Sequence, residues 1–201
     1  MSSLKLEVAA CAARLIVEEG LEYGAAKRRA LQQLAVSKAR AAQPTNEEVE
    51  DAVREHLVLF CADTQPAEIA ALRQLALDWM DRMEAFRPYL TGSVWRGTAT
   101  RHSNIFIQLF CDDPKSAEIA LIDQGVPFVP RSIVGIQGQM VDALSFSCRC
   151  EPIDEPVGLH LVVYDHDDLR GALKPDARGR APRGDASALR RLLHEAEAAR
   201  P

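Results

Sequence analysis

The sequence predicts a mixed α/β protein, in which a helical N-terminal region precedes a core built on a mixed β-sheet. Two observations support this fold class. Over residues 1–86, apolar residues recur at three- and four-residue spacing, which is the period of amphipathic helices. From residue 87 onward, short apolar runs alternate with turn residues, which is typical of strands. We therefore expect a helical region at 1–86, an α/β core at 87–173, and a flexible linker with a last helix at 174–201.

Four helices are expected in the N-terminal region. The first ends at Gly20, and the second occupies about 23–36. Thr45 and Glu48 have the spacing of a capping box, in which Thr45 caps the third helix and Glu48 reaches back to its backbone. The fourth helix begins near 64–66. The apolar stripes along these helices indicate faces that pack into a core.

The core region is expected to begin with a strand at 104–111. Asp113 and Pro114 then start a helix that continues to Asp123, since proline is favoured at the first helical position. Further strands are expected at about 133–136, 140–150 and 159–164. Gly, Pro and Arg are frequent over 174–185, which predicts a flexible segment, and the last helix starts at Asp185 or Ser187.

Composition narrows the class of protein. The chain has 201 residues, of which 47% are hydrophobic and 26% charged, as in ordinary globular proteins. No stretch approaches the roughly eighteen apolar residues of a membrane helix, and the N-terminus does not resemble a signal peptide, so a cytoplasmic protein without a membrane partner is expected. The formal net charge of −5 argues against nucleic acid as the main partner.

One segment carries a specific pattern. Gly92-Ser93 is followed, about ten residues later, by a strand that begins Asn104-Ile105-Phe106. This spacing resembles the signature of the DNA polymerase beta-like nucleotidyltransferase superfamily, and in particular its minimal nucleotidyltransferase branch. In that signature a Gly-Ser turn precedes an Asp-x-Asp strand. The resemblance proper covers residues 90–110, and the order of elements extends it loosely to Tyr164.

The resemblance implies a metal site built from acidic residues, but this sequence lacks acids at two of the expected positions. Two acids two residues apart on a strand share a face and hold Mg²⁺ over a phosphate, and a third acid on a neighbouring strand activates the attacking hydroxyl. Here the two acid positions are Asn104 and Phe106. Asparagine offers one neutral oxygen and phenylalanine offers none, so no metal or other cofactor is expected unless the protein is active with Mg²⁺. Asp142 and His160 are the two candidates for the third position.

The half of the pattern that faces phosphate is retained. Gly92 lets the backbone approach a phosphate closely, and Ser93 can donate its hydroxyl. Arg96 and Arg101 can attract the anion, and Trp95 can stack on a base. The leading hypothesis is a degenerate nucleotidyltransferase with a binding or regulatory role, which retains a nucleotide or phosphate ligand. A homodimer or another protein partner is compatible with that role.

Other interpretations stay open. The protein could be an active nucleotidyltransferase whose unusual metal site uses Asn104, Asp142 and His160, or the turn could be retained as scaffold without a ligand. A third hypothesis is a nucleic-acid-binding regulator that uses basic N-terminal helices, where the cluster 27–29 lies.

Two further clusters are predicted to be structural. Cys148 and Cys150 share one face of a strand, and no second pair completes a zinc site, so core thiols are expected. The acidic run 165–168 follows a strand and is expected to cap the helix after it. The cysteines are five in number and irregularly spaced, which predicts reduced thiols: Cys11, Cys61, Cys111, Cys148 and Cys150.

Overall fold

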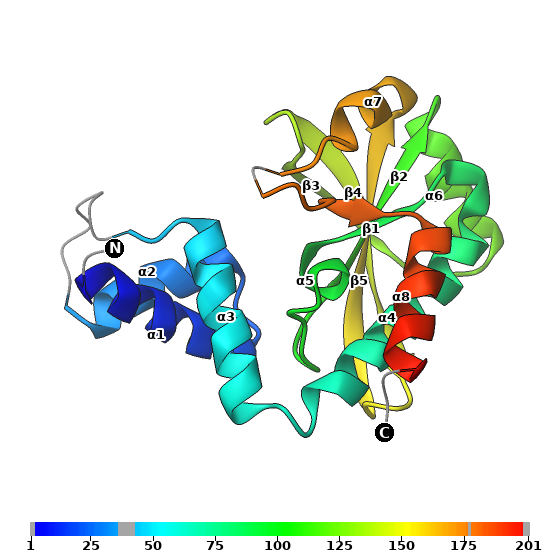
Figure 1. Cartoon of the computed structure of the whole chain (residues 1–201). Helices are drawn as coiled ribbons and strands as arrows, with labels where there is room; N and C mark the ends of the chain where they lie inside the picture. Colours follow the sequence, from blue (N-terminus) through cyan, green and yellow to red (C-terminus); the bar gives the residue numbers. More distant parts are fainter. Residues whose placement is uncertain (1–2, 36–42, 177, 199–201) are drawn as a thin grey trace. The chain divides into compact units, whose positions relative to one another are not determined.

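The computed structural model describes residues 3–35, 43–176 and 178–198. Within these ranges the chain forms eight α-helices and one six-stranded mixed sheet (Figure 1), which confirms the predicted α/β class with N-terminal helices. The chain divides into two compact units. Met1–Ala67 and Thr98–His102 form the first, and Glu68–Gly97 and Ser103–Pro201 form the second. The boundary expected at residue 86 falls inside the second unit.

The first unit is a three-helix cluster. Its helices are α1 (Ser3–Glu19), α2 (Tyr23–Gln33) and α3 (Asn46–Phe60). Their apolar stripes meet in one core, as predicted, with Val8, Ala26 and Val53 fully buried. The α2 helix ends earlier than the predicted limit, and Val36 lies outside the described residues.

The third helix begins at the predicted capping box. The Thr45 side chain accepts a hydrogen bond from the Glu48 backbone N–H at 3.2 Å, and Glu48 Oε2 accepts one from the Thr45 backbone N–H at 2.7 Å. These two bonds satisfy backbone donors that a helix start leaves without partners. The capping prediction is therefore confirmed.

The second unit contains the sheet and the remaining helices. In chain order they are α4 (Gln65–Arg82), β1 (Tyr89–Thr91), α5 (Gly92–Arg96), β2 (Ile105–Cys111), α6 (Pro114–Asp123), β3 (Val129–Val134), β4 (Met140–Cys150), β5 (Glu155–Asp165), α7 (Leu169–Ala172), β6 (Arg183–Gly184) and α8 (Ala186–Ala198). The spatial order is β3-β4-β5-β2-β1-β6. Only β2 and β5 run parallel, and every other neighbouring pair is antiparallel.

Several predicted elements have the bounds that the structure gives. The helix at 114–123 and the strand at 140–150 match, and Asp113 caps α6 by accepting from the Lys115 backbone N–H. Asp165 likewise accepts from the Asp167 N–H at the start of a 3-10 turn, as expected for the acidic run. The strand expected at 133–136 is instead β3, which starts earlier and pairs with β4 through Val134.

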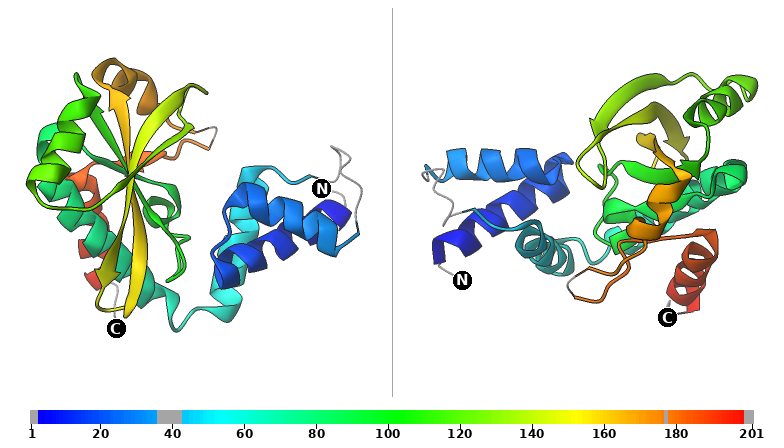
Figure 2. Two further views of the ribbon diagram at one scale, coloured as in Figure 1. Left: turned by 180° about the vertical axis from the view of Figure 1, so that it is seen from behind. Right: turned by 90° about the horizontal axis from the view of Figure 1, so that it is seen from above.

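The two faces of the sheet differ in the polarity of their side chains. One face carries fully buried side chains, including Leu90, Ile107 and Leu161. Helix α4 covers part of it, since the Trp79 ring contacts Phe146 of β4 at 4.6 Å between centroids. Figure 2 shows the sheet and its helices from two further directions. The opposite face has an apolar cluster around Phe110 that packs on α7, and a more polar region beside it.

Candidate functional site

The strand registers place five side chains in one row across the sheet. Arg183 pairs with Thr91, Thr91 with Phe106, Phe106 with His160, and His160 with Ser145. Directly paired residues point to the same face of a sheet. These residues, which we call the central row, therefore lie on the face opposite the buried Leu and Ile side chains. They come from strands β6, β1, β2, β5 and β4.

The Gly-Ser turn lies at one end of β1. Gly92 directly follows Thr91 and begins α5 with φ +74°, a conformation that favours glycine. A Cβ atom at this position would lie 3.7 Å from Phe106 Cδ2, which is an ordinary contact. The backbone angle, rather than crowding, therefore explains the glycine. Ser93 follows as the second residue of α5 and is half-buried.

Asn104 and Phe106 lie close to His160 beside this turn. The Phe106 and His160 rings stack with centroids 4.7 Å apart and planes inclined by 22°. Asn104 Oδ1 lies against Gly158, where an added Cβ would overlap it, and the same Cβ would be 3.6 Å from His160 Nε2. Three of the sequence-predicted residues are thus brought together on one face of β2 and β5.

Asp142 does not join this group. It lies on β4 opposite Val163 of β5, three residues after His160. Because side chains alternate along a strand, residues three apart point to opposite faces. Of the two candidates for the third position, the structure places His160 beside Asn104 and Phe106, and it places Asp142 on the other side of the sheet.

The surroundings of His160 favour the neutral form of its ring. Its Nδ1 lies 2.8 Å from the Oγ of Ser145, which is buried. Burial lowers the pKa of His160 below its usual value, and the positive charge of Arg131 lowers it further. Arg131 lies on β3 and pairs with Ala143, so it faces the same side as the central row. The lowered pKa disfavours a positive charge on the imidazole.

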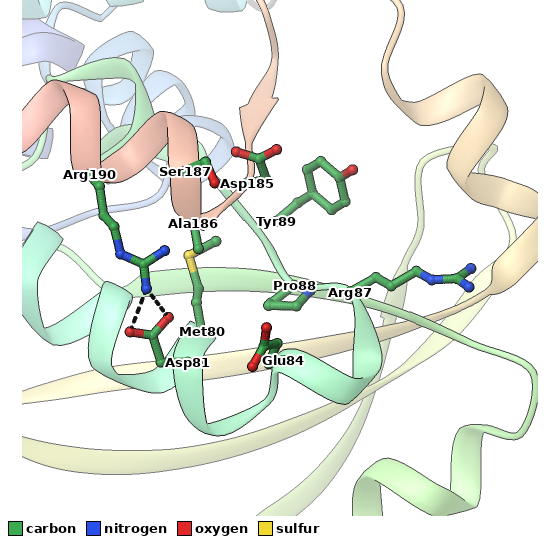
Figure 3. A pocket seen from close by; sticks show the side chains of 10 residues that line it. All are labelled: Met80, Asp81, Glu84, Arg87, Pro88, Tyr89, Asp185, Ala186, Ser187 and Arg190. Carbon is green, nitrogen blue, oxygen red and sulfur yellow. Dashed lines mark hydrogen bonds and ion pairs between the residues drawn. The ribbon is translucent and has the colours of Figure 1, made fainter.

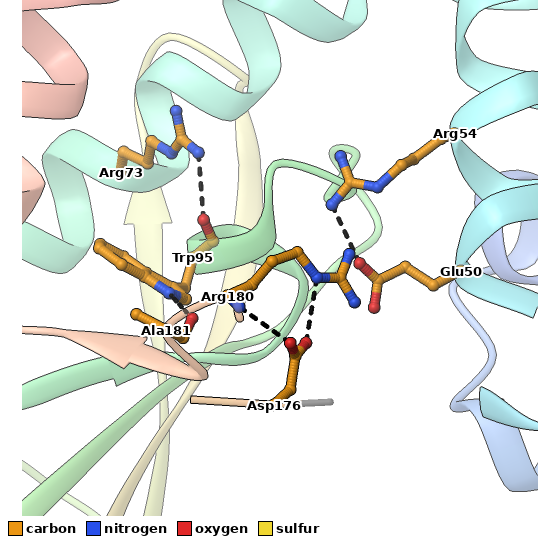
Figure 4. A network of polar contacts seen from close by, with 7 residues as sticks. All are labelled: Glu50, Arg54, Arg73, Trp95, Asp176, Arg180 and Ala181. Carbon is orange, nitrogen blue, oxygen red and sulfur yellow. Dashed lines mark hydrogen bonds and ion pairs between the residues drawn. The ribbon is translucent and has the colours of Figure 1, made fainter. Parts of the chain in front are cut away.

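Trp95 fastens the C-terminal segment to α5. Its Nε1 donates to the Ala181 carbonyl at 2.8 Å, and its ring lies so close to Gly184 that an added Cβ there would overlap it. Arg73 of α4 donates to the Trp95 carbonyl at 3.2 Å (Figure 4). The indole predicted to stack on a base is therefore packed against β6. Of the two arginines predicted beside it, Arg96 ends α5, whereas Arg101 belongs to the first unit.

Sequence reasoning did not find Arg183. This side chain is 9% exposed, and its Nη1 donates to Gln108 Oε1 on β2. Tyr164 of β5 is close enough for its charge to affect the pKa of Arg183, which burial lowers. The only sequence signal was an arginine in a stretch rich in Gly and Pro, which is typical of an exposed linker. Tertiary pairing of β6 with β1 is what buries it.

His, Cys, Asp and Glu residues are spread over the described ranges 3–35, 43–176 and 178–198. These ranges hold no group of three or more His, Cys, Asp or Glu side chains placed to bind a metal ion. Cys148 is half-buried and Cys150 buried, and burial raises the pKa of both thiols, in keeping with the predicted core role. None of the five cysteines, all of which lie within the described residues, forms a disulfide. No helix in the same ranges is both long and apolar enough to cross a membrane.

A separate cavity of about 350 Å³ lies where α4, β1 and α8 meet (Figure 3). Asp81 and Arg190 form a salt bridge at its wall, with Nη2 at 2.6 and 2.8 Å from the two carboxylate oxygens. Glu84 and Asp185 add two more carboxylates, and Tyr89 adds an aromatic ring. None of the residues predicted from the sequence to form a site lines this cavity.

Comparisons of the chain with protein-family models, with curated proteins and with solved structures give no match.

Proposed function

We propose that this protein binds a nucleotide through a nucleotidyltransferase-like site that has lost metal-dependent transfer chemistry. The observation that carries the proposal is the meeting of Asn104, Phe106 and His160 beside the Gly92 turn. The resemblance implies acids at the first two positions and a third on a neighbouring strand. An amide and two stacked rings occupy those places here.

The order and directions of strands β1, β2 and β5 support the proposal of a nucleotidyltransferase-like site. A tight turn after β1 leads into α5, β2 returns antiparallel to β1, and β5 lies parallel beside β2. The residues of β2 and β5 that face the turn are then the ones from which a metal site would be built. Phe106 and His160 are paired in that register. The resemblance of residues 90–110 thus agrees with where the side chains lie.

The chemistry of the row argues for metal-independent binding. Two Mg²⁺ ions need several anionic oxygen ligands, and the central row contains no carboxylate. Arg183, whose backbone pairs with Thr91 beside the turn, favours an anion over a cation on this face. Ser93 and the backbone of the Gly92 turn provide neutral donors for phosphate oxygens.

A thermal-shift experiment with the four ribonucleoside triphosphates, with and without Mg²⁺, tests the proposal. A ligand at a hundred times its dissociation constant adds about 2.7 kcal/mol, which moves the unfolding midpoint of a domain of this size by several degrees. We expect a shift that does not require Mg²⁺ and that is smaller in Ser93→Ala. Ser132→Ala, an exposed position on β3, is the matched control. No shift with any nucleotide would contradict the proposal.

The two alternative functions have less support. An active transferase with ligands from Asn104, Asp142 and His160 would need Asp142 on the other face of the sheet. A shift that appears only with Mg²⁺ would revive it. A nucleic-acid-binding regulator would need basic side chains that can reach phosphates. Two of the basic side chains already have partners, since Lys27 Nζ donates to Asn46 Oδ1 at 2.7 Å and Arg29 forms an ion pair with Glu19. Binding of nucleic acid that weakens steeply with salt would support that function instead.

A further inference from the structure

Arg183, in the second unit, is a buried arginine. We propose that its guanidinium is an anion site, which binds a phosphate group on the central-row face in place of the missing metal ions. The inference rests on the proposed function for the identity of the ligand, but the phosphate site itself can be tested separately.

Arg183 is buried without a compensating charge. Its side chain is 9% exposed, and its one hydrogen bond to a side chain goes to the neutral oxygen of Gln108. The Nε atom is fully buried and has no hydrogen-bond partner. Among the described residues no carboxylate forms an ion pair with this guanidinium, and burial lowers the pKa of Arg183. The Arg183 guanidinium, a group that commonly binds oxyanions, therefore has no anionic partner among the described residues.

An arrangement of this kind is costly unless something balances it. A buried charge without a partner destabilises a folded protein by several kcal/mol, and a buried donor without an acceptor adds to that cost. An oxyanion at the outer end of the guanidinium would balance the charge, because the planar group presents several N–H groups in a geometry that matches phosphate.

The position of Arg183 connects it to the retained turn. Its backbone pairs with Thr91, the residue immediately before Gly92, and Thr91 Oγ1 donates to the Pro182 carbonyl at 3.1 Å. Arg183 is thus anchored next to the turn, whereas its side chain extends along the face toward Gln108. A phosphate held by Arg183 would lie on the same face as Phe106 and His160. The ligand chemistry is that of a phosphate group, from a nucleotide or from inorganic phosphate.

The test compares inorganic phosphate with sodium chloride at matched ionic strength, by thermal unfolding and by isothermal titration calorimetry. The wild-type protein should be stabilised by phosphate beyond chloride. Arg183→Gln should bind phosphate with an affinity lower by about tenfold or more, because the substitution removes hydrogen bonds between phosphate and a charged group. Arg149→Gln is the matched control, because Arg149 lies near the end of β4 and pairs with the exposed Asp154 of the turn that follows. It should bind phosphate like the wild type.

A second variant keeps the test decisive if Arg183→Gln does not fold. Gln108→Glu places a carboxylate, nearly the same shape as the amide, against the guanidinium. We expect this variant to melt at a higher temperature than the wild type without phosphate, and to lose the stabilisation by phosphate. The two changes have opposite signs, which general loss of structure would not produce.

The outcomes separate this inference from the proposed function. No stabilisation of the wild type by phosphate beyond chloride, or full stabilisation in both Arg183→Gln and Gln108→Glu, would overturn the Arg183 site. Nucleotide binding that persists unchanged in Arg183→Gln would overturn it too, while leaving the proposed function in place. Phosphate binding through Arg183 without binding of any nucleoside triphosphate would keep the site and contradict the proposed function.

Discussion

Phe106 and His160 stack face to face, with their ring centroids 4.7 Å apart, on adjacent parallel strands. If the resemblance were complete, the position of Phe106 would hold a metal-binding acid and that of His160 the acid that activates the attacking hydroxyl. The stack converts that place into an apolar contact, which adds about 0.5–1.5 kcal/mol beyond the burial of its area. The proposed absence of metal ligands at this place thus goes together with a packing contact between two rings.

Restoring the acids should create a metal site at a cost in stability. In the double variant Asn104→Asp with Phe106→Asp, two carboxylates share one face beside Ser93 and His160, which is the arrangement that hard cations prefer. We expect Mn²⁺ binding, measured by electron paramagnetic resonance, together with a lower unfolding midpoint from loss of the stack. The two single variants are the controls and should bind Mn²⁺ more weakly. If the double variant binds no Mn²⁺, more than the two acids is missing.

Stability should decrease as the pH falls through the usual titration range of histidine. Burial and Arg131 lower the pKa of His160, so the unfolded chain takes up a proton at a higher pH than the folded protein does. The stabilisation is thus complete above the unfolded pKa of about 6.5 and is lost as the pH falls toward the folded pKa. Urea unfolding at several pH values should show this slope in the wild type and a smaller slope in His160→Gln. Equal slopes would mean that His160 is not responsible.

The contact between Trp95 and Gly184 should behave as a coupled pair. A methyl group at Gly184 would overlap the indole ring, so Gly184→Ala should destabilise the protein by about 1–3 kcal/mol. In a Trp95→Ala background the same change should cost much less, because the space is then open. A double-mutant cycle measured by urea unfolding gives the coupling energy. Additive effects would show that the ring does not press on Gly184.

The capping box should contribute measurably to the first unit. Thr45→Ala removes the acceptor for the Glu48 N–H and should cost about 1 kcal/mol. Thr45→Ser keeps a hydroxyl in the same place and serves as the control. Circular dichroism during urea unfolding follows the helices of this unit directly. The prediction fails if Thr45→Ala and Thr45→Ser are equally stable.

Local sequence signals predicted the elements whose ends are chemically marked. Asp113 and Pro114 located the start of α6, and alternation over 140–150 located β4. By contrast, β1 and β6 contain three and two residues, which is too short for any periodicity. Their existence depends on pairing between residues distant in the chain.

The sequence likewise predicted some residues of the candidate site and missed others. The spacing of Gly92 and Asn104 identified the turn and the strand after it. The sequence left Asp142 and His160 as equal candidates, because only the register of β4 on β5 decides which face each one occupies. Arg183 could not be recognised, since an arginine is buried by its tertiary surroundings and not by its neighbours in the chain.

The pairing of β6 with β1 has a consequence for how the sheet is completed during folding. Thr91 and Pro182, which are joined by a hydrogen bond, are 91 residues apart. Until the ribosome has released the later segment, the outer edge of β1 has unpaired backbone groups that can recruit another strand. Truncations that stop before Arg183 should therefore aggregate, and a fusion partner that protects this edge during synthesis should improve their yield.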